Sequence, residues 1–128
     1  MSMNKERFDQ LSEGLLFMSE TDAPLDYYEL DSERSRQWPP STGGQFLQLI
    51  KEDPGTHVEK LAPEKFFRDL RLGNEDREDQ VAALEKAMTG EVRNLEGFRV
   101  GEIQINIFVL GTDDLGKVVG LRTLSVET

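Results

Sequence analysis

The C-terminal part of the sequence carries the pattern that most limits the fold, a strict alternation along residues 103–109. Ile103, Ile105, Ile107 and Val109 occupy every second position, and alternate residues of a strand point to the same face of a sheet. Residues 111–116 begin and end with glycine and are expected to form a loop, from which residues 117–126 return as a partner strand. The core must therefore be built on a sheet that contains this hairpin.

The rest of the chain combines helical and strand patterns. Apolar residues at helical spacing predict helices over residues 4–18 and from about 78 to 93. Ser41 or Thr42 can cap another helix, and Pro63 suits the first position of a fourth. Strands are expected at residues 25–30 and 57–61. Helices packed on a mixed sheet follow, an α/β (α+β) class, in a single domain spanning residues 1–128.

The formal net charge of −10 is concentrated in two segments. The first acidic segment, residues 6–31, holds eight acidic residues and one basic residue, and the second, residues 74–79, holds four and one. The remaining residues balance to zero. Charge gathered in this way gives the molecule a directional field that favours a basic partner.

Several function classes are disfavoured by what the sequence lacks. It has no cysteine, one histidine (His57) and no phosphate-binding or dinucleotide-binding motif, so we expect a protein that is not an enzyme and needs no cofactor. A hydrolase with paired carboxylates remains an alternative by residue type. A sequence pI near 4.6 argues against direct binding of nucleic acid. No apolar run has the length of a membrane span, and we expect a cytoplasmic protein that is a monomer by itself.

Two stretches are specific enough to indicate a family. Residues 14–20 read GLLFMSE with a proline four residues later, and residues 98–103 read FRVGEI, leading to Val126, Glu127 and Thr128 at the end of the sequence. In this order and at these ends of the chain, both resemble the nuclease A inhibitor family of small bacterial proteins. The resemblance is dense over residues 14–31 and 98–128 and weak over residues 32–55.

The resemblance implies a three-layer α/β/α sandwich similar to the pathogenesis-related-1 fold. It also implies a protein that binds one-to-one in the substrate cleft of a non-specific, metal-dependent DNA/RNA endonuclease of the ββα-metal class. An acidic protein can imitate the polyanionic substrate of such an enzyme. The alternative is an acidic interaction module for another basic or nucleic-acid-binding protein.

The resemblance also implies contact residues. Glu20 matches a family glutamate that pairs with a basic residue of the nuclease cleft. Thr128 matches a C-terminal threonine whose oxygens approach the nuclease's metal, so it is a candidate metal ligand in trans. Glu127 is a candidate rim contact. The second acidic segment contributes the remaining candidates for nuclease binding, Glu75, Asp76, Glu78 and Asp79.

The sequence also departs from the family pattern. The family's acidic loop carries aromatic residues, which are typical anchors of interfaces, and the second acidic segment has none. Trp38 lies in a charged stretch, residues 32–40, that is longer than its family counterpart. We expect Trp38 to pack on the body of the protein, although it is also a candidate to replace the lost aromatic contact.

Overall fold

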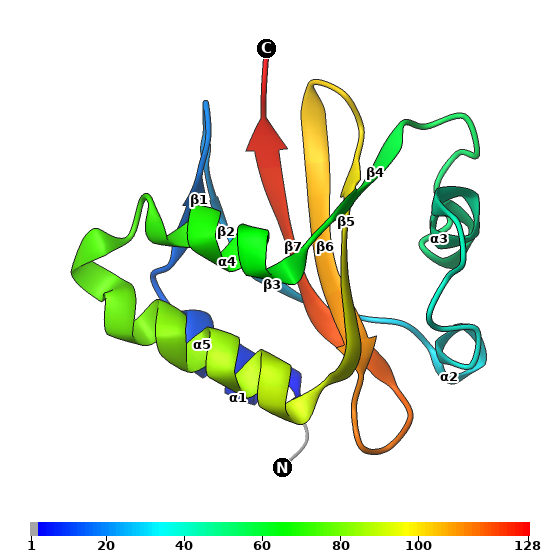
Figure 1. Cartoon of the computed structure of the whole chain (residues 1–128), viewed down its shortest axis with the longest axis horizontal. Helices are drawn as coiled ribbons and strands as arrows, with labels where there is room; N and C mark the ends of the chain where they lie inside the picture. The colour runs from blue at the N-terminus through cyan, green and yellow to red at the C-terminus, as the bar shows by residue number, and fades with distance from the viewer. Residues whose placement is uncertain (1–2) are drawn as a thin grey trace.

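A computed structural model describes residues 3–128 and confirms the α+β class (Figure 1). Its helices and strands are α1 (Lys5–Ser12), β1 (Leu16–Met18), β2 (Asp22–Pro24), β3 (Asp26–Glu29), α2 (Ser32–Ser35), α3 (Gly43–Leu49), β4 (Val58–Leu61), α4 (Pro63–Arg71), the 3₁₀ helix η1 (Glu75–Arg77), α5 (Glu78–Glu91), β5 (Arg93–Val100), β6 (Gln104–Thr112) and β7 (Val118–Val126). The expected starts of α3 after Thr42, of α4 at Pro63 and of α5 at residue 78 are all confirmed.

The main sheet has the strand order β3-β7-β6-β5-β4. The predicted hairpin is confirmed as β6 and β7, whose register runs from Gln104 opposite Val126 to Thr112 opposite Val118. The loop is shorter than expected, because residues 111 and 112 still pair with β7. The expectation of a mixed sheet is wrong, because every pairing in the main sheet is antiparallel. β5, β6 and β7 follow one another through short connections, which allow only antiparallel pairing.

Helices lie on both faces of this sheet, with α1, α4 and α5 on one side and α2 and α3 on the other (Figure 1). Ile105, Ile107 and Val109 of β6 face the core beneath α1, α4 and α5. Phe108 and Leu110 face a second core beneath α3. The alternation in β6 therefore separates two buried faces, which explains why Phe108 interrupts a simple polar and apolar pattern.

The helix expected over residues 4–18 is wrong beyond Ser12. Gly14 adopts φ +80°, a left-handed conformation that favours glycine, and the chain then forms β1. β1 pairs with β2 in a separate antiparallel hairpin, with Phe17 opposite Ala23. Phe17 stacks on Phe66 of α4, with ring centroids 5.5 Å apart. Local periodicity carries no signal of this contact between distant segments, and the helical spacing of Leu15 and Met18 therefore predicted a longer helix than the structure has.

Strand β5 was also missed, since its residues fall between the expected helix and the expected hairpin. Its start is irregular: Asn94 has φ 52° and the register with β6 shifts between Arg93 and Glu96. The expected packing of Trp38 on the body is confirmed. Its ring lies edge-on to Phe46 and Phe98, and its Nε1–H donates to the Asn94 carbonyl oxygen at 3.0 Å.

Candidate partner-binding site

Glu20 and Thr128, which are 108 positions apart, are hydrogen-bonded to each other. The backbone N–H of Thr128 donates to Oε2 of Glu20 at 2.6 Å, and the Thr128 hydroxyl donates to Oε1 at 2.8 Å. Both residues are exposed. The structure thus brings together the two anchors expected from the sequence in one surface patch, which we call the chain-end site together with Glu127.

The β1–β2 turn is attached to the end of β7 by its backbone and by one hydroxyl. The Glu20 N–H donates to the Val126 carbonyl oxygen at 3.3 Å, and the Val126 N–H donates to the Ser19 hydroxyl at 3.0 Å. Ser19 also donates its backbone N–H to the Thr21 carbonyl oxygen at 2.9 Å, which closes the turn. Glu20 is therefore carried by a turn whose position is set by β7. The role of Ser19, although it lies in the GLLFMSE stretch, was not predicted.

Glu127 is held by two side chains and by its own backbone. Arg99 of β5 donates to its carboxylate oxygens at 2.7 and 2.8 Å, and the Ser125 hydroxyl donates to Oε2 at 2.8 Å. These donors, Arg99 foremost, hold the pKa of Glu127 below its ordinary value. The Glu127 N–H donates to the Ile103 carbonyl oxygen at 2.9 Å. Arg99 was missed from the sequence, because only strand pairing brings β5 close to residue 127.

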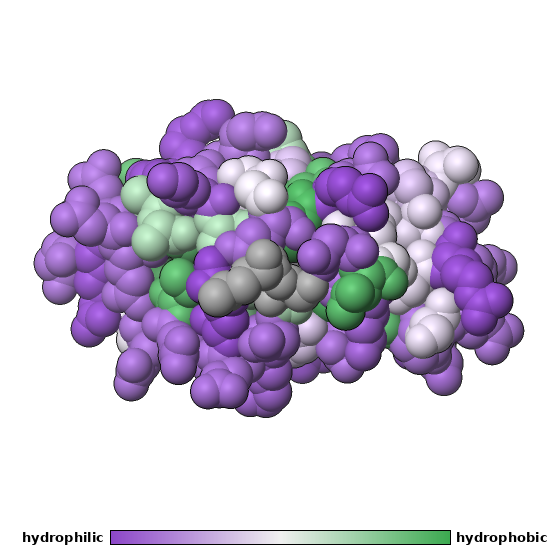
Figure 2. Space-filling model, turned by 90° about the horizontal axis from the view of Figure 1, so that it is seen from below, coloured by the Kyte–Doolittle hydropathy of each residue, from purple (hydrophilic) through white to green (hydrophobic). Residues whose placement is uncertain are grey.

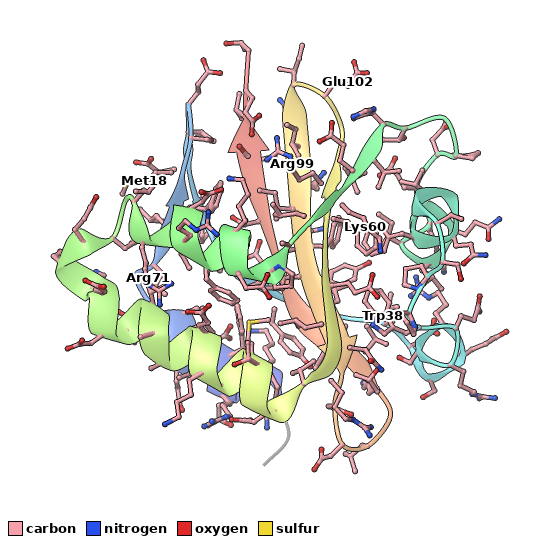
Figure 3. All side chains as sticks on the ribbon, viewed as in Figure 1. Met18, Trp38, Lys60, Arg71, Arg99 and Glu102 are labelled. Atoms are coloured by element: carbon pink, nitrogen blue, oxygen red, sulfur yellow. The ribbon has the colours of Figure 1, made fainter. Side chains whose placement is uncertain are left out.

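An open groove of about 490 Å³ lies beside the chain-end site. Its walls include Met18, Leu72 after α4, and Arg99, together with Glu20 and Thr128. Figure 3 shows Met18 next to the loop that follows α4, and shows Arg99 and Glu102 toward the end of the sheet where the C-terminus lies. The groove therefore combines carboxylates, one cation and apolar side chains.

A smaller hollow of about 210 Å³ lies on the other side of Arg99. There His57 Nε2 lies 2.7 Å from Oε1 of Glu59, and this contact lowers the pKa of the Glu59 carboxyl. Within residues 3–128, no group of three or more histidine and acidic side chains is arranged to hold a metal ion. His57 is thus one member of an exposed hydrogen-bonded pair at the edge of the site.

The second acidic segment is positioned by Asn74, the buried residue at its start. The Asn74 amide donates to the carbonyl oxygens of Leu16 in β1 at 2.9 Å and of Leu70 in α4 at 2.6 Å. Next to it, Gln80 of α5 donates to the carbonyl oxygens of Leu11 and Glu13 at 3.0 and 2.7 Å. These bonds fasten the second acidic segment to the N-terminal part of the first. Neither Asn74 nor Gln80 was predicted, since each acts through backbone groups far away in the sequence.

The acidic side chains of the second acidic segment point into solvent. Glu75 and Asp76 belong to η1, and Glu78 and Asp79 form the first turn of α5, where negative charge complements the helix dipole. All four are exposed, and in the part of the chain that the structure describes their carboxylates have no hydrogen bond or ion pair. They are not among the residues that line the groove. The structure thus separates these candidates from Glu20, Glu127 and Thr128.

Compared with known protein families, residues 3–128 match the family model described as nuclease A inhibitor-like protein. No curated protein matches the chain.

Of the helices in residues 3–128, none has the length and apolar character needed to cross a membrane.

Proposed function

The chain belongs to the nuclease A inhibitor-like family, and we propose that it binds one-to-one in the substrate cleft of a metal-dependent, non-specific DNA/RNA endonuclease and inhibits it. The match covers residues 3–128, so the family assignment rests on nearly the whole chain and not on an isolated motif. The inhibitor itself needs no cofactor and does not bind nucleic acid directly.

The observation that carries this proposal is the bond between Glu20 and Thr128. The family resemblance implies each of these two residues as a contact, and they are 108 positions apart in the sequence. In the fold they share hydrogen bonds of 2.6 to 2.9 Å on an exposed surface. One nuclease cleft can therefore reach both at once, as a pair of anchors must be reached.

Charge supplies the second part of the mechanism. The net charge of −10 and the exposed carboxylates of Glu75, Asp76, Glu78 and Asp79 imitate the phosphates of a nucleic acid. A nuclease that holds phosphates presents Arg and Lys side chains, so opposite fields speed the encounter and orient the two proteins. This attraction weakens with salt, because ions screen exposed charges.

Thr128 supplies the third part. Its side chain carries a hydroxyl, and oxygen atoms are the ligands that divalent Mg²⁺ and Mn²⁺ prefer. Thr128 therefore approaches the metal of the nuclease as a ligand in trans. Glu127, neutralised by Arg99, contributes at the rim and keeps the end of β7 in place.

Two observations weigh against the paired-carboxylate hydrolase. A general acid of that class needs a raised pKa, whereas Arg99 lowers the pKa of Glu127 in the groove. The carboxylate of Glu20 accepts hydrogen bonds from Thr128.

The four free carboxylates of the second acidic segment would also serve an acidic interaction module for another basic protein. A pull-down at low salt that recovers a DNA-binding protein and no nuclease would favour that alternative.

The test is a titration of a purified ββα-metal endonuclease encoded in the source genome. We expect complete inhibition at an equimolar ratio, and a loss of affinity of roughly tenfold or more for both Glu20→Ala and deletion of Thr128. Glu33→Ala is the matched control, because Glu33 is an exposed glutamate on α2, away from the site. Equal inhibition by the parent and both site variants would refute the anchors, and a parent that does not inhibit would refute the function.

A further inference from the structure

Large hydrophobic side chains are exposed at four positions of the described chain, and three of them surround the chain-end site. The exposed fractions are 47% for Met18, 72% for Leu72 and 60% for Ile103; the fourth, Leu115, is 83% exposed. Leu115 lies in the β6–β7 loop, at the end of the sheet opposite the C-terminus (Figure 1). Seen from that opposite end, most of the surface is hydrophilic (Figure 2).

Met18 and Leu72 lie together on one side of the chain-end site. Along β1, Phe17 points into the core and Met18 points outward. The Met18 side chain crosses Gly73 so closely that a Cβ at that glycine would lie 2.5 Å from its Cγ and Sδ atoms. Leu72 immediately precedes Gly73 and caps the end of α4. Both side chains line the groove beside Glu20 and Thr128.

Ile103 lies on the other side. It belongs to the β5–β6 turn, and its carbonyl oxygen accepts the Glu127 N–H at 2.9 Å. Met18 and Leu72 therefore border the groove, and Ile103 is attached to the chain-end site through Glu127. Single exposed hydrophobic residues need no explanation, but a group gathered around one polar site is typical of an interaction surface.

We propose that Met18, Leu72 and Ile103 are the apolar contacts of this interface, and that they bury aliphatic or aromatic side chains which flank the basic cleft of the partner nuclease. The inference rests on the proposed function. Its occupant is fixed by charge: Glu20 lines the same groove as Met18 and Leu72, and Gly73 joins Leu72 to the second acidic segment, so the partner needs Arg or Lys beside its apolar side chains. A partner without that basic character would leave these carboxylates without a counter-charge.

The physical need for such contacts is clear from the missing aromatic residues. Charges steer two proteins together, but affinity depends mainly on a few well-packed anchors that exclude water. The second acidic segment has no aromatic side chain to act as an anchor. Met18 and Leu72, close to that segment, supply apolar area in its place. Methionine suits this use because its flexible thioether adapts to an irregular surface.

The experiment measures binding of the full chain to the catalytically disabled nuclease by calorimetry, at about 0.05 M and about 0.5 M salt. We expect Leu72→Ser and Met18→Ser each to weaken binding by roughly fivefold or more, and Ile103→Ser by somewhat less. The factor should be the same at both salt concentrations, because burial of apolar area is not screened. Leu72→Met keeps the apolar area and should bind like the parent.

The control is Leu115→Ser, which removes a still more exposed leucine at the far end and should leave binding unchanged. Circular dichroism should match the parent for all these variants, and thermal unfolding should change measurably only for Met18→Ser, because the Met18 side chain also packs on Gly73. If the parent inhibits the nuclease and the three serine variants bind as tightly as it does, the inference is wrong while the proposed function stands. If the parent binds no nuclease of this class, both are wrong.

Discussion

The carboxylates of the chain-end site are held by hydrogen bonds, whereas those of the second acidic segment are free. Glu20 accepts two donors from Thr128, and Glu127 accepts donors from Arg99 and Ser125. By contrast, within residues 3–128 no bond restrains the carboxylates of residues 75, 76, 78 and 79. The same chemical group is thus used in two ways on one protein.

The difference indicates that the two groups of carboxylates have separate roles in binding. A restrained carboxylate has lost much of its conformational freedom before binding, so it presents a fixed acceptor at little further entropic cost. A free carboxylate stays fully solvated and acts through its long-range field, which affects the rate of encounter more than the lifetime of the complex. The following predictions test this comparison, from the largest expected effect to the smallest.

Asn74→Ala should have the largest effect on stability, because Asn74 joins the second acidic segment to β1, the strand that leads into the turn with Glu20. Its buried side chain bonds to Leu16 and Leu70, and its loss leaves their carbonyl oxygens without this donor. We expect the free energy of unfolding to fall by about 2 kcal/mol in urea denaturation. Gln48→Ala, an exposed change on α3, should stay within about 0.5 kcal/mol of the parent. A similarly small change for Asn74→Ala would show that the second acidic segment is not fastened to β1 in solution.

A double-mutant cycle at the chain-end site comes next. Glu20→Gln and deletion of Thr128 remove two partners of the same bond, so their losses of nuclease affinity should not add. We expect a coupling energy of about 1 kcal/mol or more. Glu75→Gln combined with deletion of Thr128 is the matched comparison and should be additive within about 0.5 kcal/mol. Full additivity in both cycles would mean that the Glu20–Thr128 contact does not organise the site.

Arg99→Gln should remove the ion pair of Glu127, so that its carboxylate becomes less restrained and more like those of the second acidic segment. Since the folded-state pKa of Glu127 is depressed, its contribution to stability is present above the ordinary value of 4.5 and is lost as the pH falls through the lower folded pKa. With the Glu127 side chain 47% exposed, solvent screening limits the loss at pH 7 to about 0.5–1 kcal/mol. The difference from the parent should narrow on acidification below 4.5.

Arg36→Gln, an exposed change beside α2, is the control for this measurement. It should show no such dependence on pH between neutral and acidic solution. A difference between Arg99→Gln and the parent that stays constant on acidification would indicate that Arg99 stabilises the fold through packing and not through Glu127.

Neutralising the free carboxylates should have the smallest effect. In Glu75→Gln/Asp76→Asn, we expect the association rate with the nuclease to fall by roughly two- to fivefold at low salt, with little change in the dissociation rate. At high salt the difference should disappear. The variant Glu33→Gln/Glu52→Gln removes two charges near α2 and α3 and should alter the rate less. A slower association that persists at high salt would mean that residues 75 and 76 make direct contacts.

The sequence predicted those parts of the fold in which local pattern and tertiary burial agree. Ile105, Ile107 and Val109 alternate because one face of β6 packs on the core beneath α1, α4 and α5, so the hairpin was predictable, although Ile103, which continues the same alternation, lies exposed in the β5–β6 turn. The stretch after Ser12 was not, because Leu15 and Met18 continue a helical period while Phe17 packs on Phe66. In the site, Glu20 and Thr128 were reached through the family resemblance. Their bond depends on a hairpin docking against β7, and Arg99 on strand pairing, neither of which leaves a local signal.

The position of β7 in the sheet has a consequence for how the protein folds. β7 lies between β3 and β6, and Asp26 pairs with Arg122, so this pairing joins segments that are far apart in the sequence. Contacts of large sequence separation form slowly. Until β7 inserts, β3 and β6 each have an open edge that can pair with another chain. The interval before this insertion is therefore the stage of folding at which the molecule is most exposed to aggregation.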